Sequence, residues 1–314
     1  MKLIKPSFEI IEQQSGLDGM FKQIELAGRT CYKSEDKITE TSAKEFVDRL
    51  IKSGHTSVLE HGSIYLYIET DARPSLMVKE IIDFYKYNKY SHVNSKYILD
   101  KNQDSHTPLI IGYKYYISTN LRVCIENDRK EFLNPSLLCE PTEFHEKRVC
   151  VRFILPIGIS REFCRHRSFS FAEMSTRYCN FSKDRFNKEL TFIIPPFSNA
   201  LEGHYSSGEE VISANLKDHF SKGSAGWIFY ETLSRAEKTY IQLVTILGVN
   251  NKPIYTPQQA RDVLPLATKT ELVMTGFVSD WKHFFKLRCD TAAHPQAREL
   301  AIPLKEEFMN RGYI

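Results

Sequence analysis

Strand-like and helix-like segments follow one another in an irregular order along this chain, and that order limits the folds open to it. Runs rich in β-branched and aromatic residues occur at 64–68, 149–154, 190–194 and 271–278. Amphipathic helical patterns occur at 17–32, 42–53, 76–87, 224–247 and 280–288, and Pro295 begins another helix. A doubly wound parallel sheet would need regular strand–helix alternation. The pattern therefore favours an α+β fold, with a mixed or antiparallel sheet flanked by helices.

One helix start can be placed from local chemistry alone. Thr256 is a good N-cap residue, Pro257 suits the first helical position, and Gln259 stands three residues after the cap. The helix that begins here would present Arg261 and end before Pro265.

Domain organisation is less marked. The 314 residues contain no internal repeat, low-complexity tract or Gly/Ser linker, so we expect a single domain over residues 1–314. Residues 70–148 are rich in Tyr, Asn, Lys and Asp and are interpreted as a large insertion between two strands, at 64–68 and 149–154, that could otherwise pair. The insertion could cover a sheet edge, or it could form a lid or a contact between subunits.

The composition excludes several classes of protein. Hydrophobic residues make up 42% and charged residues 26%, as in folded globular proteins, and the net charge of +3 gives no sign of a nucleic-acid or membrane partner. No apolar run approaches the roughly 18 residues that span a bilayer. Seven scattered cysteines without a C-x-x-C pair predict reduced thiols, no metal site and a cytoplasmic location.

Charged and polar side chains are unusually dense between residues 161 and 178. The segment holds Arg161, Glu162, Arg165, His166, Arg167, Ser170, Glu173, Ser175 and Arg177. An isolated R-H-R could simply compensate a helix dipole. However, small polar residues and aromatics alternate after it, which suits a ligand-binding surface. Guanidinium forks bind phosphate and imide edges, and carboxylates accept from hydroxyl or ring N–H groups, so the segment indicates a nucleotide site.

This segment resembles the signature of the flavin-dependent thymidylate synthases. The family pattern R-H-R-x7-S is met by Arg165, His166, Arg167 and Ser175, and its fuller form also by Ser170, Glu173, Arg177 and Tyr178. Ala172 stands where the family usually has Asn.

Two other regions resemble family segments in the same order along the chain. Glu60-His61 resembles the E-H pair near the flavin, with Ser63 close to a flavin phosphate contact. Residues 260–265 resemble the A-R-x-x-L-P segment, and Leu287, Arg288, Asp290 and Ala301 resemble the closing L-R-x-D block. The resemblance covers about 17–69 and 149–305.

The resemblance implies roles for individual residues. It implies FAD contacts for His61, Ser63, Arg165, His166, Arg167, Glu173, Ser279 and His283. It implies dUMP contacts for Glu162, Arg165, Glu173, Ser175, Thr176, Arg177, Arg261 and Arg288, with Arg288 and Ser175 catalytic. It further implies NADPH and methylenetetrahydrofolate as co-substrates and a homotetramer with shared active sites.

The chemistry of Arg288 fits the role that the resemblance gives it. Attack by C5 of uracil on a methylene donor places negative charge on the ring oxygens and N3, where a prepositioned guanidinium contributes on the order of 3 kcal/mol. No Pro-Cys pair is present, so no cysteine nucleophile is expected.

Three further positions depart from the family pattern. Glu162 stands where many relatives have Gln, and Arg161 or Arg165 is expected to neutralise it. Phe277 and His283 stand where Asn is common.

Two alternatives remain open at this point. A related flavoenzyme could act on another pyrimidine nucleotide or transfer another one-carbon unit. A nucleic-acid-binding protein could use the interleaved Arg and aromatic residues, but the near-neutral net charge disfavours it.

Overall fold

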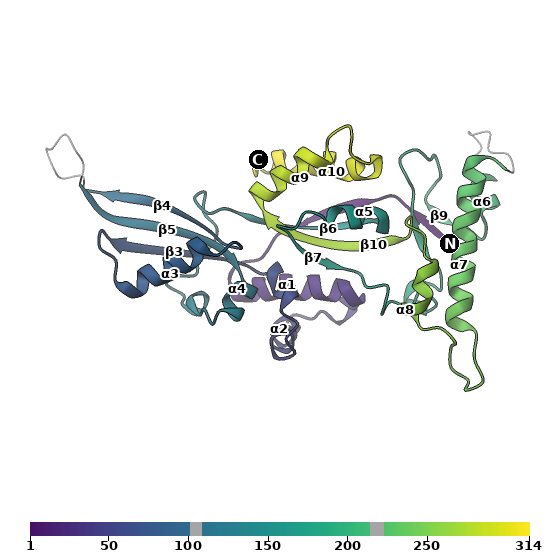
Figure 1. Cartoon of the computed structure of the whole chain (residues 1–314), viewed down its shortest axis with the longest axis horizontal. Helices are drawn as coiled ribbons and strands as arrows, with labels where there is room; N and C mark the ends of the chain where they lie inside the picture. Colours follow the sequence, from purple (N-terminus) through teal and green to yellow (C-terminus); the bar gives the residue numbers. More distant parts are fainter. Residues whose placement is uncertain (101–108, 214–222) are drawn as a thin grey trace.

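Three small β-sheets follow one another along the long axis of the molecule (Figure 1). The computed structural model describes residues 1–100, 109–213 and 223–314. The central sheet has the order β2 (Ser7–Ile11), β6 (Arg148–Pro156), β10 (Lys269–Phe277), β7 (Ser170–Glu173). One flanking sheet has the order β3 (Ser63–Asp71), β5 (Ile110–Asn120), β4 (His92–Leu99), and the other has the order β8 (Thr191–Ile193), β1 (Lys2–Ile4), β9 (Gly203–His204).

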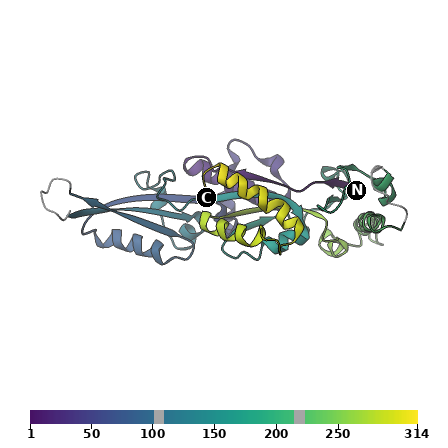
Figure 2. The ribbon, with the colours of Figure 1, turned by 90° about the horizontal axis from the view of Figure 1, so that it is seen from above.

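The central sheet is antiparallel throughout and is covered by helices on both faces. Its longest pairing, β6 with β10, runs from Pro156 opposite Lys269 to Arg148 opposite Phe277. Helices α9 (Val278–Arg288) and α10 (Pro295–Asn310) cover one face, and α1 (Gly16–Tyr32) and α2 (Ser42–Lys52) lie on the other side (Figures 1 and 2). The mixed α+β class and the flanking helices expected from the sequence are therefore confirmed.

Alternation along β6 decides what each face buries. Successive strand residues point to opposite faces, and Phe153 joins the large aromatic core with Trp281, Phe284 and Phe308 under α9 and α10. Arg148, Cys150 and Arg152 point to the opposite face of the sheet, toward α1 or toward polar side chains such as Glu271. A single strand thus supplies a hydrophobic core on one side and, on the other, the buried Arg148 and the half-buried Arg152.

The segment 70–148 builds most of a sheet of its own. Strands β4 and β5 pair with each other, and β5 pairs with β3 from Ser63 opposite Asn120 to Asp71 opposite Gly112. Helix α3 (Leu76–Tyr87) and the short α4 (Leu121–Glu126) pack against this sheet. The possible pairing of the runs at 64–68 and 149–154 does not occur, because β5 takes the place beside β3 while β6 pairs with β2 and β10. Residues 101–108 of this segment lie outside the described residues.

The remaining elements form the end of the molecule that carries the N-terminus. Helices α6 (Gly208–Ser213) and α7 (Ala225–Thr245) pack together beside the β8-β1-β9 sheet (Figure 1). The short α8 (Pro257–Ala260) begins at the predicted cap, where the backbone N–H of Thr256 donates to Gln259 Oε1 at 2.9 Å. In the described part of the chain, no helix has the length and apolar character needed to cross a membrane.

Candidate active site

The dense polar segment of the sequence connects two strands of the central sheet. Strand β6 ends at Pro156, α5 (Ile157–Phe163) follows, and after a turn the chain enters β7, which pairs with β10. Helix α5 is only seven residues long. Adjacent residues on a helix point in different directions. Arg161 and Glu162 therefore belong to two different clusters, one on each side of the helix.

The first cluster is centred on Arg288, at the end of α9. Its Nη1 donates to Glu162 Oε2 at 2.7 Å, its Nη2 donates to the Glu162 carbonyl oxygen at 2.5 Å, and its Nε donates to His166 Nε2 at 3.0 Å. Because an arginine can only donate, His166 accepts through Nε2 and is neutral here. Burial, with Arg288 and His283 adding to it, lowers the pKa of His166 to about 4.

This cluster corrects one expectation. Glu162 is neutralised by Arg288, and not by Arg161 or Arg165 on its own segment. The reason is geometric, because Arg288 enters from α9 on the Glu162 side of α5. Three of the five guanidinium N–H groups of Arg288 are used in these contacts, so two remain for a ligand.

The second cluster surrounds a cavity of about 600 Å³, which we call the Glu173 cavity. Its polar wall is formed by Arg161, Glu173, Ser175, Thr176, Arg261 and Asp262. Residues from β7, α5 and the Arg261–Val263 turn therefore meet around one space. Four of the residues predicted to contact dUMP line it: Glu173, Ser175, Thr176 and Arg261.

Glu173 lies at the base of this cavity in a partly apolar setting. Ser160 Oγ donates to Glu173 Oε1 at 2.7 Å. Burial raises the pKa of Glu173 against the opposing effects of Ser160, Thr270 and Arg161. A carboxyl group whose pKa is raised is suited to exchanging hydrogen bonds with a neutral ring edge.

The remaining arginines of the motif are not brought to either cluster within one chain. Arg165, Arg167 and Arg177 are exposed, and no carboxylate of the described residues lies within 4 Å of them. Arg177 lies over the Tyr178 ring, with 5.4 Å from its Cζ to the ring centroid, and its backbone N–H donates to Ser175 Oγ at 3.3 Å.

The flavin contacts implied by the resemblance lie at very different depths. His61 is fully buried and its Nδ1 is 2.8 Å from Thr275 Oγ1, and burial, with Arg148 nearby, lowers its pKa to about 3. Ser63 is also buried. By contrast, Ser279 and His283 are exposed on α9, and the Ser279 backbone N–H donates to Glu146 Oε1 at 2.9 Å.

Sequence reasoning missed Arg148, which links these buried groups. Its Nη1 donates to the Glu60 carbonyl oxygen at 2.9 Å and to Ser63 Oγ at 3.4 Å, and its guanidinium lies over the Phe277 ring. Its Nε has no partner among the described residues. The only signal in the sequence was a pair of arginines four residues apart in an apolar strand, which places both on one face.

Comparison with known proteins gives the family. The family model described as "Thymidylate synthase complementing protein" matches residues 14–134 and 140–311. The chain belongs to this family. The match includes most of the segment 70–148, which lay outside the resemblance found from the sequence motifs.

Curated relatives of this family member carry a consistent name. The chain is 29% identical over 153 residues to a flavin-dependent thymidylate synthase from Synechocystis sp., covering 48% of this chain and 61% of the relative. It is 28% identical over 152 residues to a probable flavin-dependent thymidylate synthase from Paramecium bursaria Chlorella virus 1, covering 48% and 62%. The matched part thus spans about three fifths of each of these two relatives.

A solved structure was also matched. It is the UMP/dUMP methylase PolB from Streptomyces cacaoi bound with 5-Br dUMP, at 16% identity, with 99% of this chain and 93% of that chain covered. Its TM-score of 0.38 is too low for the pairing to bear on fold or function.

Proposed function

We propose that this family member is a flavin-dependent thymidylate synthase, a methyltransferase that converts dUMP to dTMP. In this proposal FAD is the cofactor, methylenetetrahydrofolate is the one-carbon donor and NADPH is the reductant. The observation that carries the proposal is the arrangement around α5. Its Arg161 side borders the Glu173 cavity with Arg261, and its Glu162 side holds Arg288.

In this proposal the Glu173 cavity binds the nucleotide. Arg261 and Ser175 bind the phosphate and ribose, Thr176 borders the same part of the ligand, and Glu173 accepts from or donates to the polar edge of the ring. Arg177 reaches the ligand only in the assembled homotetramer. The cavity volume of about 600 Å³ is within the range of small-molecule sites.

In this proposal Arg288 of one subunit activates the pyrimidine bound in the Glu173 cavity of another subunit, because the Arg288 cluster and this cavity lie on opposite sides of α5 in the single chain. When C5 attacks the one-carbon donor, negative charge develops on the ring oxygens and N3, and a fixed guanidinium stabilises that charge without reorganising. Glu162 and His166 hold Arg288 in one orientation through its Nη1, Nη2 and Nε. The two N–H groups left over are the ones available to the ring.

The cysteines support chemistry without a thiolate nucleophile. Burial raises the pKa of Cys31 and of Cys164, each to about 11. Burial also raises the pKa of Cys179 and of Cys289. Thiols with such raised pKa values stay protonated at neutral pH, and the thiolate is the nucleophilic form.

The flavin would supply the redox step when bound, and the exposed side chains fit it. Arg165, Arg167 and His283 offer exposed donors on the surface for phosphate and ring atoms. His61 and Ser63 are covered by protein in the single chain. Among the described residues, His61 Nε2 and Arg148 Nε have no hydrogen-bond partner, so this buried patch is able to take a further polar partner.

The quaternary structure is part of the proposal. A homotetramer would bring Arg165, Arg167 and Arg177 of one subunit to clusters on another, which accounts for their exposure in the single chain. We also propose a cytoplasmic location, because all seven cysteines are free thiols.

Spectroscopy and isotope release test the function. Purified protein should be yellow, its flavin absorbance should bleach with NADPH, and tritium should be released from C5-labelled dUMP when the folate is added. Colourless protein that takes up no FAD would refute the proposal. Flavin binding without tritium release from dUMP would favour the second candidate, action on another pyrimidine nucleotide or one-carbon unit. That candidate is supported by Glu162, because its carboxylate pairs with the Arg288 guanidinium at 2.7 Å.

A further inference from the structure

A second cavity lies beside the Glu173 cavity and has no part in the function proposed above. Its volume is about 440 Å³, and Met174 lines both cavities. We call it the basic cavity and define it by Lys2, Lys33, Arg185, Lys269, Phe181 and Phe186. The C-terminal end of α1, the start of β10 and the segment around residue 185 therefore enclose a space that opens next to the proposed nucleotide site.

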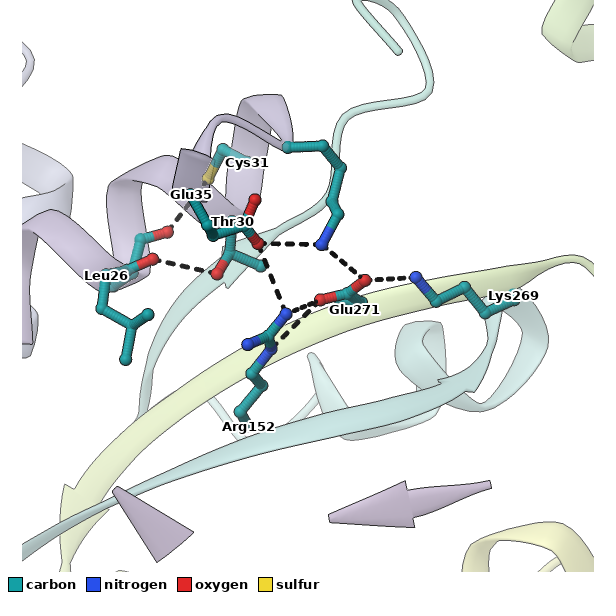
Figure 3. A network of polar contacts seen from close by, with 9 residues as sticks. Leu26, Thr30, Cys31, Glu35, Arg152, Lys269 and Glu271 are labelled. Carbon is teal, nitrogen blue, oxygen red and sulfur yellow. Dashed lines mark hydrogen bonds and ion pairs between the residues drawn. The ribbon is translucent and has the colours of Figure 1, made fainter. Parts of the chain in front are cut away.

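Two of its lysines belong to a charge network that is itself short of carboxylates. Lys33, Arg152 and Lys269 all contact the Glu271 carboxylate, which is 4% exposed (Figure 3). Lys33 and Arg152 also reach Glu35, at 2.8 and 3.3 Å. Three cations thus share two carboxylates within 4 Å, and Glu9, opposite Arg152 in the sheet, acts on that arginine from farther away.

The other two cations of the wall have no opposite charge in contact. Among residues 1–100, 109–213 and 223–314, no carboxylate lies within 4 Å of the Lys2 amine or the Arg185 guanidinium. The carboxylates that line the cavity are Glu35, Asp36 and Glu189. Glu189 is already engaged by the N-terminal amine at 4.0 Å and by His204 at 2.8 Å. The wall therefore carries an excess of positive charge.

An apolar surface stands beside these cations. The rings of Phe181 and Phe186 lie 5.1 Å apart, edge to face, and the Cζ of Arg185 lies 4.9 Å from the centroid of the Phe186 ring. A flat apolar group can pack on these rings while negative charges reach the lysines and Arg185.

We propose that the basic cavity binds the anionic end of a second substrate, a ligand with a flat apolar group and at least two negative charges. That this ligand is a co-substrate of the same reaction rests on the proposed function. Both co-substrates of that reaction have this chemistry. The folate ends in an aminobenzoyl group bearing glutamate carboxylates, and NADPH carries an adenine with an adjacent phosphate.

Calorimetric titration of the full chain tests the proposal with two probes. p-Aminobenzoyl-glutamate presents the carboxylate form of the ligand, and adenosine 2′,5′-bisphosphate presents the phosphate form. At least one probe should bind, and Arg185→Gln should weaken that binding about tenfold, the effect expected for losing one charge-assisted hydrogen bond. Lys2→Gln should weaken it in the same direction. Binding of the first probe alone identifies the folate type of ligand, binding of the second alone identifies the dinucleotide type, and binding of both shows that the cavity accepts either anion.

Lys188→Gln is the matched control. Lys188 lies three residues from Arg185, pairs with exposed Asp184 at 2.9 Å, and does not line the cavity, so its loss should leave probe binding unchanged. Absence of binding of both probes, or equal loss in Lys188→Gln and Arg185→Gln, would overturn the proposal.

Flavin and dUMP titrations on the same samples separate this inference from the proposed function. Probe binding by a chain that binds neither FAD nor dUMP would support the basic cavity and contradict the function. Binding of FAD and dUMP without binding of either probe would support the proposed function and contradict the role of the basic cavity.

Discussion

Replacing Glu271 by Gln tests whether the buried charge network stabilises the fold. Burial alone would raise the pKa of Glu271, but the contacts of Lys269 and Lys33 outweigh it and hold the pKa at about 2. The gap from the ordinary value of 4.5 corresponds to about 3 kcal/mol of stability at neutral pH. Removing one partner of a buried ion pair costs about 3–5 kcal/mol, because the remaining charges lose their partner. We therefore expect Glu271→Gln to lower the free energy of unfolding by about 3 kcal/mol at pH 7.

The pH dependence of this difference is the sharper result. Because the folded pKa of Glu271 is below the unfolded value, its contribution is complete above pH 4.5 and is lost as pH falls toward 2. Gln does not titrate, so the gap between the two proteins should narrow over that window. Urea unfolding at several pH values, followed by the fluorescence of buried Trp281, measures both quantities.

Asp184→Asn provides the control for this experiment. Asp184 pairs with Lys188 on the surface, where an ion pair contributes little, so its loss should leave unfolding unchanged. If Glu271→Gln matches the wild type at pH 7, or if the difference stays constant from pH 7 to pH 3, the ionised Glu271 carboxylate does not stabilise the fold.

Other substitutions test the site and the packing around it. Arg288→Ala should leave FAD uptake nearly intact and abolish turnover, as measured by flavin absorbance and tritium release; equal loss of both would contradict its role toward the pyrimidine. Ser175→Ala should raise the Kd for dUMP or slow its turnover, and unchanged kinetics would refute its assignment. Gly276→Ala should destabilise the fold by about 1–3 kcal/mol, because a Cβ there would lie 2.4 Å from the Phe169 ring, and an unchanged thermal midpoint would show that the ring moves freely. His166 should stay neutral between pH 5 and 8 by nuclear magnetic resonance, since its pKa lies at about 4; a titration near pH 6.5 would mean that its contact with Arg288 does not form.

The sequence determined the longer helices, whereas strands such as β4 and β5 were not predicted. The helix predicted at 17–32 is Gly16–Tyr32, the one at 76–87 is Leu76–Tyr87, and the one at 224–247 is Ala225–Thr245. The cap at Thr256 is present as expected. These features depend on periodicity and on contacts three or four residues apart, so they can be inferred without knowledge of the fold.

Four residues to which the resemblance gives dUMP contacts, Glu173, Ser175, Thr176 and Arg261, line the Glu173 cavity, and their roles stay predictions. The resemblance could not assign ion-pair partners. Glu162 and Arg288 are 126 residues apart, and only the packing of α9 against α5 brings them to 2.7 Å.

Tertiary structure alone decided which strands share a sheet and which charges are buried. Strand β3 pairs with β5 because the chain between residues 70 and 148 supplies a closer partner than β6. Arg148 and Arg152 share one face of β6, yet Arg152 meets the Glu271 carboxylate whereas Arg148 meets a carbonyl and hydroxyl oxygens. Strand periodicity fixes the face of a side chain, but its partners come from other elements, up to 119 residues away along the chain. The free energy of a buried charge depends on those partners, so it could not be inferred from the sequence.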